Sequence, residues 1–338
     1  MYKAVIVDRD YGSISIDKQH LIKEEYNKNG IKLALNHFKT PEEIIENCKD
    51  VDIILGTGNP PITREVIESL PNLKIIQRFG VGVNSIDLEA ATEHGVLVLF
   101  MPGFCASELA YHSIALAMSI LRNVVFYDRE IRNGEWPKAK GPVPRDPKNL
   151  VLGLYGFGDS AKPLYNIFKH GFGSRVIAND KYINPETLTD YDIELVEFED
   201  LLRESDIISI HAPLTNETRH IFNKNTFKLM KNDSIIINVA RGPIINEEDL
   251  IEALENNEIG FAGLDVFESE PLEENSKLLT MDNVVLTAHS AFYGDGAQKN
   301  QIQWSIDLVD QAINHKKINN KFIANKDVTS KIEGLRRS

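Results

Sequence analysis

Short apolar runs rich in valine and isoleucine alternate with amphipathic stretches along most of the chain. In the first hundred residues these runs are Lys3–Val7, Ile31–Leu35, Val51–Leu55, Leu73–Gln77 and Val96–Phe100. Stretches with helical spacing of apolar residues lie between them, for example Ile16–Asn29 and Arg64–Leu70. Runs without polar alternation are typical of strands buried on both faces, and strand–helix alternation is typical of βαβ units. The pattern therefore predicts an α/β fold with a parallel sheet covered by helices.

A second series of apolar runs follows a long helical stretch, Ser107–Arg132, and a proline-containing loop, Gly134–Lys148. Its members are Leu150–Tyr155, Arg175–Asn179, Ile207–His211, Ser234–Val239, Phe261–Leu264 and Val284–Thr287. Helical periodicity returns over residues 297–315, after the second series has ended. We therefore expect two doubly wound sheet domains, with the last helices returning to the first domain.

Composition narrows the classes of partner. The 338 residues carry 37 basic and 50 acidic side chains, a net charge of −13, which repels nucleic acid and anionic membranes. No apolar run approaches the roughly 20 residues of a membrane span. Two cysteines, Cys48 and Cys105, are too few for a disulfide framework or a four-cysteine zinc site. We expect no nucleic-acid or membrane partner, no metal, and a cytoplasmic location.

A glycine-rich turn follows the first strand of the second series. Gly156 permits a tight turn, Gly158 lets backbone amides approach a diphosphate, and Ala161 takes the third position of a G-x-G-x-x-A pattern. Asp180 ends the next strand, where a carboxylate accepts hydrogen bonds from an adenosine ribose and disfavours the extra phosphate of NADP. This context predicts an NAD site, against the alternative of an ordinary strand–helix turn.

Two residues of this turn are unusual for a diphosphate site. Asp159 places a negative charge beside the phosphates, and Pro163 lacks the N–H that a helix interior needs. If the helix begins at Ser160 as its cap, Pro163 falls in the first turn, where proline is tolerated. We therefore expect Ser160 to cap the helix.

Three charged or titratable residues follow strands later in the chain. Arg241 comes directly after the run Ser234–Val239, at the edge where parallel sheets place ligands, and a guanidinium can bind a carboxylate with two hydrogen bonds. Glu270 and His289 lie in the segments after the next two strands. Taken singly, each residue has an ordinary structural alternative, a surface ion pair for the arginine and a packed side chain for the histidine.

Together and in this order, these segments resemble the D-isomer-specific 2-hydroxyacid dehydrogenase family. The resemblance covers nearly the whole chain, with its closest likeness to the branch that contains C-terminal-binding-protein-like and D-lactate-type members. The segments that carry it are Arg78–Asp87, Pro102–Cys105, His211–His220, Asn238–Gly242, Gly263–Pro271 and Leu286–Tyr293.

The resemblance implies the domain organisation. A flavodoxin-like substrate domain is expected from residues 1–101 plus 291–338, and a Rossmann NAD-binding domain from residues 102–290, with a cleft between them. Members of the family are usually dimers through the helix that Ser107–Arg132 matches. A homodimer through residues 107–132 is therefore expected.

The resemblance also implies residue roles. Arg241 holds the substrate carboxylate and keto oxygen, His289 is the acid/base, and Glu270 orients and charges that histidine. Backbone amides near Val81 and Gly82 bind the substrate carboxylate. The expected cofactor-binding residues are Gly156, Gly158, Asp159, Ser160, Asp180, Pro213, Thr218, Ala240, Arg241, Asp265 and His289.

The expected reaction is hydride transfer between NAD(H) and a small D-2-hydroxy or 2-oxo acid. An ionised carboxylate at Glu270 favours the protonated form of His289, so that a proton is available for the keto oxygen during reduction. The alternative from another class is a dinucleotide-sensing interaction protein, like the corepressors of the neighbouring branch, which keeps the three residues but shows little turnover.

Overall fold

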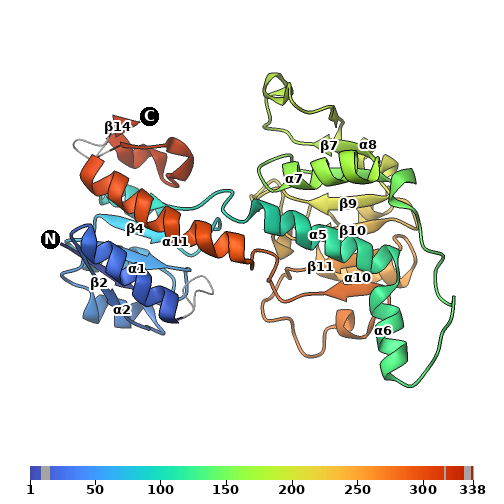
Figure 1. Cartoon of the computed structure of the whole chain (residues 1–338), viewed down its shortest axis with the longest axis horizontal. Coiled ribbons are helices and arrows are strands. Elements are labelled where there is room, and N and C mark those ends of the chain that lie inside the picture. Colours follow the sequence, from blue (N-terminus) through green and yellow to red (C-terminus); the bar gives the residue numbers. More distant parts are fainter. Residues whose placement is uncertain (9–15, 316, 331–335, 338) are drawn as a thin grey trace. The chain divides into compact units, whose positions relative to one another are not determined.

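A computed structural model describes residues 1–8, 16–315, 317–330 and 336–337 of the chain. It divides into two compact units, Met1–Phe104 with Tyr293–Ser338, and Cys105–Phe292 (Figure 1). The predicted boundaries lay after residues 101 and 290. Residues 102–104 belong with the first unit, where the Phe104 carbonyl accepts a hydrogen bond from the Asn300 side chain.

The first unit contains a five-stranded parallel sheet. Its spatial order is β2 (Ile31–Leu35), β1 (Tyr2–Ile6), β3 (Ile53–Gly56), β4 (Ile75–Arg78) and β5 (Leu97–Leu99). This is the 2-1-3-4-5 order of flavodoxin-like folds. Isoleucine, leucine and valine side chains fill both faces because helices cover the sheet on each side.

Helices of this unit lie in two layers. One face carries α2 (Pro41–Asn47), α3 (Arg64–Ser69) and α4 (Leu88–Glu93), and the other carries α1 (Ile16–Lys28) and α11 (Asp295–Asp310) (Figure 1). The Tyr26 hydroxyl of α1 donates to the carbonyl of Ser305 in α11 at 2.9 Å. The C-terminal helix therefore packs in the first unit, as the sequence predicts.

The second unit contains a seven-stranded parallel sheet. Its spatial order is β12 (Val284–Leu286), β11 (Phe261–Leu264), β10 (Ile235–Asn238), β9 (Ile207–Ile210), β6 (Val151–Tyr155), β7 (Arg175–Asn179) and β8 (Glu194–Leu195). Counted from β6, this is the classical Rossmann order extended by one strand. Strand order reverses between the neighbours β6 and β9. From β6 the chain continues to β7 and β8 on one side, and then crosses to β9 on the other side. The ligand-binding switch point of such sheets lies at their carboxyl ends.

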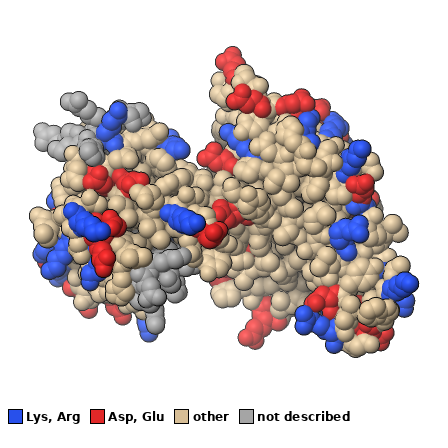
Figure 2. All heavy atoms as spheres, in the orientation of Figure 1, with Lys and Arg blue, Asp and Glu red and all other residues tan. Residues whose placement is uncertain are grey.

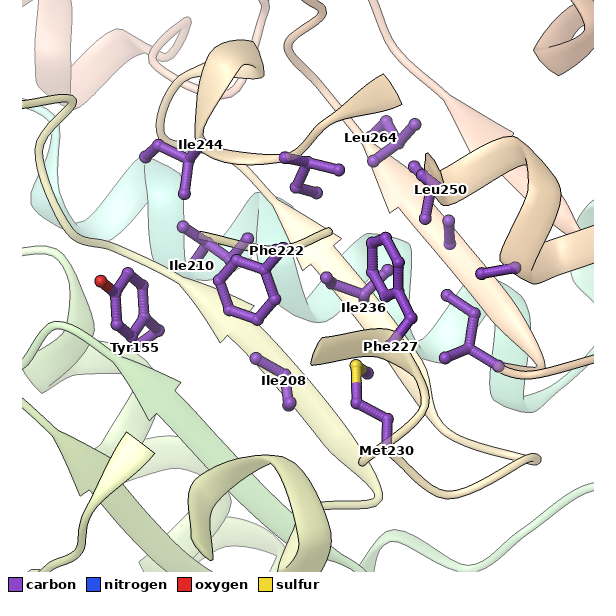
Figure 3. Close-up of a cluster of buried hydrophobic side chains, with 14 of the residues drawn as sticks. Tyr155, Ile208, Ile210, Phe222, Phe227, Met230, Ile236, Ile244, Leu250 and Leu264 are labelled. Carbon is purple, nitrogen blue, oxygen red and sulfur yellow. The ribbon is translucent and has the colours of Figure 1, made fainter. Parts of the chain in front are cut away.

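Helices cover this sheet on both faces. One core packs α5 (Ala106–Leu121) and α7 (Ala161–Asn166) against the sheet. The other packs α8 (Phe198–Glu204), α9 (Lys224–Phe227) and α10 (Glu247–Glu255) against Ile208, Ile210 and Ile236 (Figure 3). Alternation along β9 sends Ile208 and Ile210 to this second core and Ser209 to the α7 face. The α/β class with two parallel-sheet domains is confirmed.

The predicted single helix Ser107–Arg132 is wrong in one respect. It is two helices, α5 and α6 (Val124–Arg132), bent by 63° at a break where Asn123 takes a left-handed conformation (φ 55°). The Asn123 side chain donates to the Pro142 carbonyl at 2.7 Å, so the break is fixed by the following loop. Helical periodicity does not reveal this break because asparagine is tolerated inside helices as well as in left-handed turns.

The distribution of surface charge and the lengths of the helices relate to the predicted absence of nucleic-acid and membrane partners. On the face in Figure 2, basic and acidic side chains are interspersed. Within the described ranges, no single helix is long and apolar enough to cross a membrane, and the bent pair α5–α6 reaches that length only jointly.

Candidate active site

The glycine turn after β6 fits a bound diphosphate. Gly156 has φ +90°, and a Cβ there would lie 2.7 Å from the Ala212 backbone nitrogen, so only glycine allows this approach of the turn to the end of β9. Around Gly158, by contrast, a Cβ would meet no atom within 4 Å. The turn thus leaves open space beside its exposed backbone, as the diphosphate of a dinucleotide requires.

Helix α7 begins directly after this turn. Pro163 is its third residue, so its missing N–H costs no hydrogen bond, as predicted. Ser160 takes the N-cap position, as predicted, but its side chain makes no capping hydrogen bond to a helix amide. Its Oγ lies instead 3.1 Å from Nδ1 of His211. Asp159 is exposed beside the open turn.

The Asp180 carboxylate sits at the end of β7 and ties the turn together. Oδ2 accepts the Phe157 N–H at 2.8 Å, and Oδ1 accepts the N–H groups of Tyr182 and Ile183 at 2.9 and 3.1 Å. The acid is therefore held next to the glycine turn in the position predicted for a ribose acceptor.

The loop after β9 carries two more predicted cofactor residues. The Thr218 hydroxyl donates to the Pro213 carbonyl at 2.7 Å and accepts the Thr215 N–H at 2.8 Å. These bonds close a compact loop beyond the carboxyl end of β9. Strand β9 is the neighbour of β6, the strand that leads into the glycine turn.

Arg241 follows β10 in a turn that a buried asparagine shapes. The Asn238 side chain accepts the Ala240 N–H at 3.0 Å and donates to the Arg241 carbonyl at 2.9 Å. A Cβ at Gly242 would lie 1.9 Å from the Phe267 backbone, so the turn presses against the loop that carries Glu270. Burial lowers the pKa of Arg241, Glu270 and Cys105 oppose that shift, and the guanidinium stays charged at neutral pH.

Glu270 and His289 form a direct pair. Nδ1 of His289 lies 2.6 Å from Oε2 of Glu270, and the other carboxylate oxygen of Glu270 accepts the Phe267 N–H at 3.1 Å. Burial opposes ionisation of Glu270, but hydrogen bonds from His289 and Phe267, together with the charge of Arg241, lower its pKa. An ionised carboxylate is therefore available to hold the imidazole.

Asp265 lies beneath the His289 loop and is 1% exposed. Its carboxylate accepts the Thr287 hydroxyl at 2.6 Å and the N–H groups of Ser290 and Ala291 at 2.9 and 2.8 Å. Its carbonyl accepts the His289 N–H at 2.7 Å. Asp265 therefore fixes the backbone on both sides of the histidine.

Val81 and Gly82, the expected substrate-binding residues, lie in the other unit on the loop after β4. Val81 is 43% exposed. Arg78, at the end of β4, donates from Nε to the Gly82 carbonyl at 2.7 Å and from Nη1 to the Phe79 carbonyl. The guanidinium thus shapes this loop, a role that the segment Arg78–Asp87 does not predict from its sequence alone.

Apart from Val81 and Gly82 in the first unit and Pro213 and Thr218 in the loop after β9, the predicted residues form two groups within the second unit. The glycine turn gathers Gly156, Gly158, Asp159, Ser160 and Asp180, and the segments after β10, β11 and β12 gather Ala240, Arg241, Asp265, Glu270 and His289. His211 was missed as a site residue. Its signal is its place directly after β9, the strand beside the glycine turn.

No metal centre emerges from the part of the chain that the structure describes. There, no three His, Cys, Asp or Glu side chains are grouped to hold an ion.

Comparisons with known proteins agree with this arrangement. The family model "D-isomer specific 2-hydroxyacid dehydrogenase, NAD binding domain" matches residues 114–291, more than half of the chain. Glyoxylate reductase of Thermococcus litoralis is 36% identical over 286 residues, covering 79% of this chain and 85% of the relative. D-3-phosphoglycerate dehydrogenase of Methanocaldococcus jannaschii is 38% identical over 261 residues, covering 77% of this chain, which spans about half (49%) of that relative.

Solved structures show the same two-domain fold. A glyoxylate reductase from Paecilomyes thermophila is similar with a TM-score of 0.82 and 28% identity, covering 93% of this chain and 95% of that chain. The matched model names NAD, and the glycine turn and Asp180 of this chain fit that cofactor. The chain therefore belongs to the D-isomer-specific 2-hydroxyacid dehydrogenase family and is an NAD-dependent oxidoreductase of 2-hydroxy and 2-oxo acids.

Proposed function

We propose that this enzyme reduces a 2-oxo acid of glyoxylate size, with His289 as the proton donor, Glu270 as its orienting carboxylate and Arg241 as the substrate-binding cation. The observation that carries the proposal is the 2.6 Å pair of His289 Nδ1 and Glu270 Oε2 in the domain that also holds Arg241. Two of the similar proteins bear the name glyoxylate reductase, which supports the small substrate.

The histidine–glutamate pair determines which imidazole nitrogen can act. NADH, when bound, supplies the hydride that reduces the keto carbon. Glu270 is ionised and can only accept, so Nδ1–H of His289 donates to it. Nε2 is then the nitrogen left to carry the proton for the keto oxygen, as a general acid.

Arg241 supplies positive charge to the same reaction. Its guanidinium can bind a carboxylate through two hydrogen bonds and stabilises negative charge that grows on the keto oxygen. Because the side chain is largely buried, its charge is weakly screened by water. The turn built by Asn238 fixes where this charge lies.

The remaining predicted cofactor residues keep their roles in this proposal. Pro213, Thr218, Ala240 and Asp265 lie at the carboxyl ends of β9, β10 and β11, where Rossmann sheets bind dinucleotides. The substrate-binding role of the Val81 and Gly82 amides also stays a prediction.

The test is an NADH-oxidation assay with glyoxylate, pyruvate, hydroxypyruvate, 3-phosphohydroxypyruvate and phenylpyruvate, with NADPH as the control cofactor. We expect oxidation of NADH with the smallest acids and weaker use of NADPH, because Asp180 repels its extra phosphate. NADH binding without oxidation by any of these acids would contradict the proposal and favour the dinucleotide-sensing alternative. The reported relatives are named as enzymes, and they offer that alternative no support.

We further propose that the enzyme is a cytoplasmic homodimer through residues 107–132. Apolar side chains remain exposed on α5, α6 and the loop that follows: Tyr111, Val124, Val125, Ile131, Trp136 and Val143. An apolar surface of this kind is typical of a protein–protein interface. Both cysteines are free, which fits a reducing compartment. Light scattering should give twice the chain mass, and Val124→Glu should yield monomers. A monomeric wild-type enzyme would contradict the dimer.

A further inference from the structure

Three polar side chains form a hydrogen-bonded line from the sheet to the glycine turn. Ser209 Oγ lies 2.9 Å from Nε2 of His211, and Nδ1 of His211 lies 3.1 Å from Ser160 Oγ. Ser209 is in the middle of β9, His211 directly follows this strand, and Ser160 follows the turn Gly156–Gly158. The line therefore links a buried strand serine to the hydroxyl of Ser160, which follows Gly158 by two positions.

The imidazole in this line is neutral. Burial lowers the pKa of His211 to about 4, so at physiological pH it carries one N–H and one bare nitrogen. Each serine hydroxyl can donate or accept. The position of the single proton on His211 therefore decides the direction of both hydrogen bonds.

Ser209 decides between the two directions. Its side chain is 0% exposed, and His211 is the sole hydrogen-bond partner of its hydroxyl among the described residues. If Nε2–H donated to Ser209, the buried Ser209 hydrogen would have no acceptor, which carries a desolvation penalty. If instead Ser209 donates to a bare Nε2, the Ser209 hydrogen and both ring nitrogens of His211 have partners.

With Nε2 bare, the proton sits on Nδ1 and donates to Ser160 Oγ. Ser160 is only partly buried, and His211 is its only side-chain partner among the residues that the structure describes. Its own hydrogen is then free for a ligand at the turn. We propose that Ser209 fixes the tautomer of His211 so that the Ser160 hydroxyl donates to the cofactor diphosphate.

This role gives a physical account of an unusual turn. Asp159 places an acidic side chain beside the site of the phosphates, and a committed hydroxyl donor at the next residue offsets that repulsion. Ser209 and His211 are positioning residues, since they act through Ser160. The inference rests on NAD binding and not on the substrate, so its failure and the failure of the 2-oxo acid proposal are distinguishable.

The first test observes the tautomer. Long-range proton–nitrogen correlation spectra of the enzyme with isotope-labelled histidine, assigned by loss of the signals in His211→Asn, report which ring nitrogen carries hydrogen. We expect Nδ1–H in the wild type, both alone and saturated with ADP, and a gain of Nε2–H in Ser209→Ala. A wild-type ring protonated on Nε2, or on both nitrogens at neutral pH, would overturn the proposal.

The second test measures binding without turnover. Ser160→Ala should weaken NADH and ADP binding by about tenfold or more, as loss of a hydrogen bond to a charged group does, and leave adenosine binding unchanged. Ser209→Ala, although buried, should weaken ADP binding in the same direction. Ser234→Ala is the matched control, because this buried serine next to β10 has no hydrogen-bond partner for its hydroxyl among the described residues. Equal losses for ADP and adenosine, or no loss for ADP in Ser160→Ala, would contradict the assignment.

Discussion

His289 Nδ1 lies 2.6 Å from Glu270 Oε2, and the histidine holds this contact with its backbone in the left-handed region, at φ 49°. Such a conformation costs of order 1–3 kcal/mol outside glycine and persists where the surroundings impose it. Here the surroundings are Asp265, whose carbonyl accepts the His289 N–H and whose carboxylate binds the next two amides. The backbone conformation of His289 thus orients the imidazole, and Glu270 holds it through Nδ1.

Replacing Glu270 by glutamine tests the charge beside the imidazole. Glu270→Gln keeps the shape of the side chain but removes the ionised carboxylate that accepts from Nδ1 of His289 and holds the imidazole, so kcat for 2-oxo acid reduction should fall by about tenfold or more. Glu268→Gln is the control, because this carboxylate two residues earlier binds His220 and the Glu247 N–H instead. Equal losses in the two variants would argue against a specific role of Glu270.

The shape of the cation at position 241 matters as well as its charge. Arg241→Lys keeps a positive charge but loses the planar fork that binds a carboxylate through two hydrogen bonds, so kcat/KM for the 2-oxo acid should fall by about a hundredfold. NADH binding, followed by fluorescence, should change little in comparison. An unchanged kcat/KM would remove Arg241 from the substrate site.

Asp265 should contribute to stability through the His289 loop. Asp265→Asn replaces an acceptor oxygen by a donor facing Thr287 or the loop amides, and should lower the free energy of unfolding by about 2 kcal/mol. Asp282→Asn removes an exposed partner of Arg129 and should cost less than about 1 kcal/mol. Calorimetric melting of both variants provides the measurement, and equal melting temperatures would contradict the role of Asp265.

Ionisation of the Asp206 carboxyl group should make the stability of the fold depend on pH. Burial opposes its ionisation, but the Val151 N–H, Lys231 and Arg145 outweigh burial and lower its pKa. A carboxyl group with a lowered pKa in the folded state stabilises the fold above its unfolded pKa of about 3.9, and this contribution is lost as pH falls through the folded value. Asp206→Asn should therefore reduce stability at neutral pH by about 2 kcal/mol, with a difference that shrinks at acid pH. A difference that stays constant down to about pH 3 would contradict this account.

The fold was largely predictable because its strands are short, apolar and separated by helical periodicity. Runs such as Ile207–His211 and Ser234–Val239 include the observed strands β9 and β10 to within a residue or two. The break at Asn123 was not predictable from periodicity, because it depends on the distant Pro142 carbonyl.

Site residues that directly follow a strand could be predicted from the sequence. A residue whose role depends on a hydrogen bond to a side chain distant in the sequence could not. Arg241, Glu270 and His289 stand in segments after neighbouring strands, and the structure brings the last two into contact. Ser160 was expected to cap a helix, yet its hydroxyl bonds His211, a residue far away in sequence. Local sequence preferences cannot report such long-range side-chain contacts.

The most direct test of the proposed acid is single-turnover reduction of glyoxylate by NADH in the wild type and in His289→Gln, with NADH binding measured on the same samples. Removal of a general acid should slow the chemical step by at least about a hundredfold while NADH still binds. A His289→Gln enzyme that oxidises NADH at the wild-type rate would contradict the assignment of His289 as the proton donor.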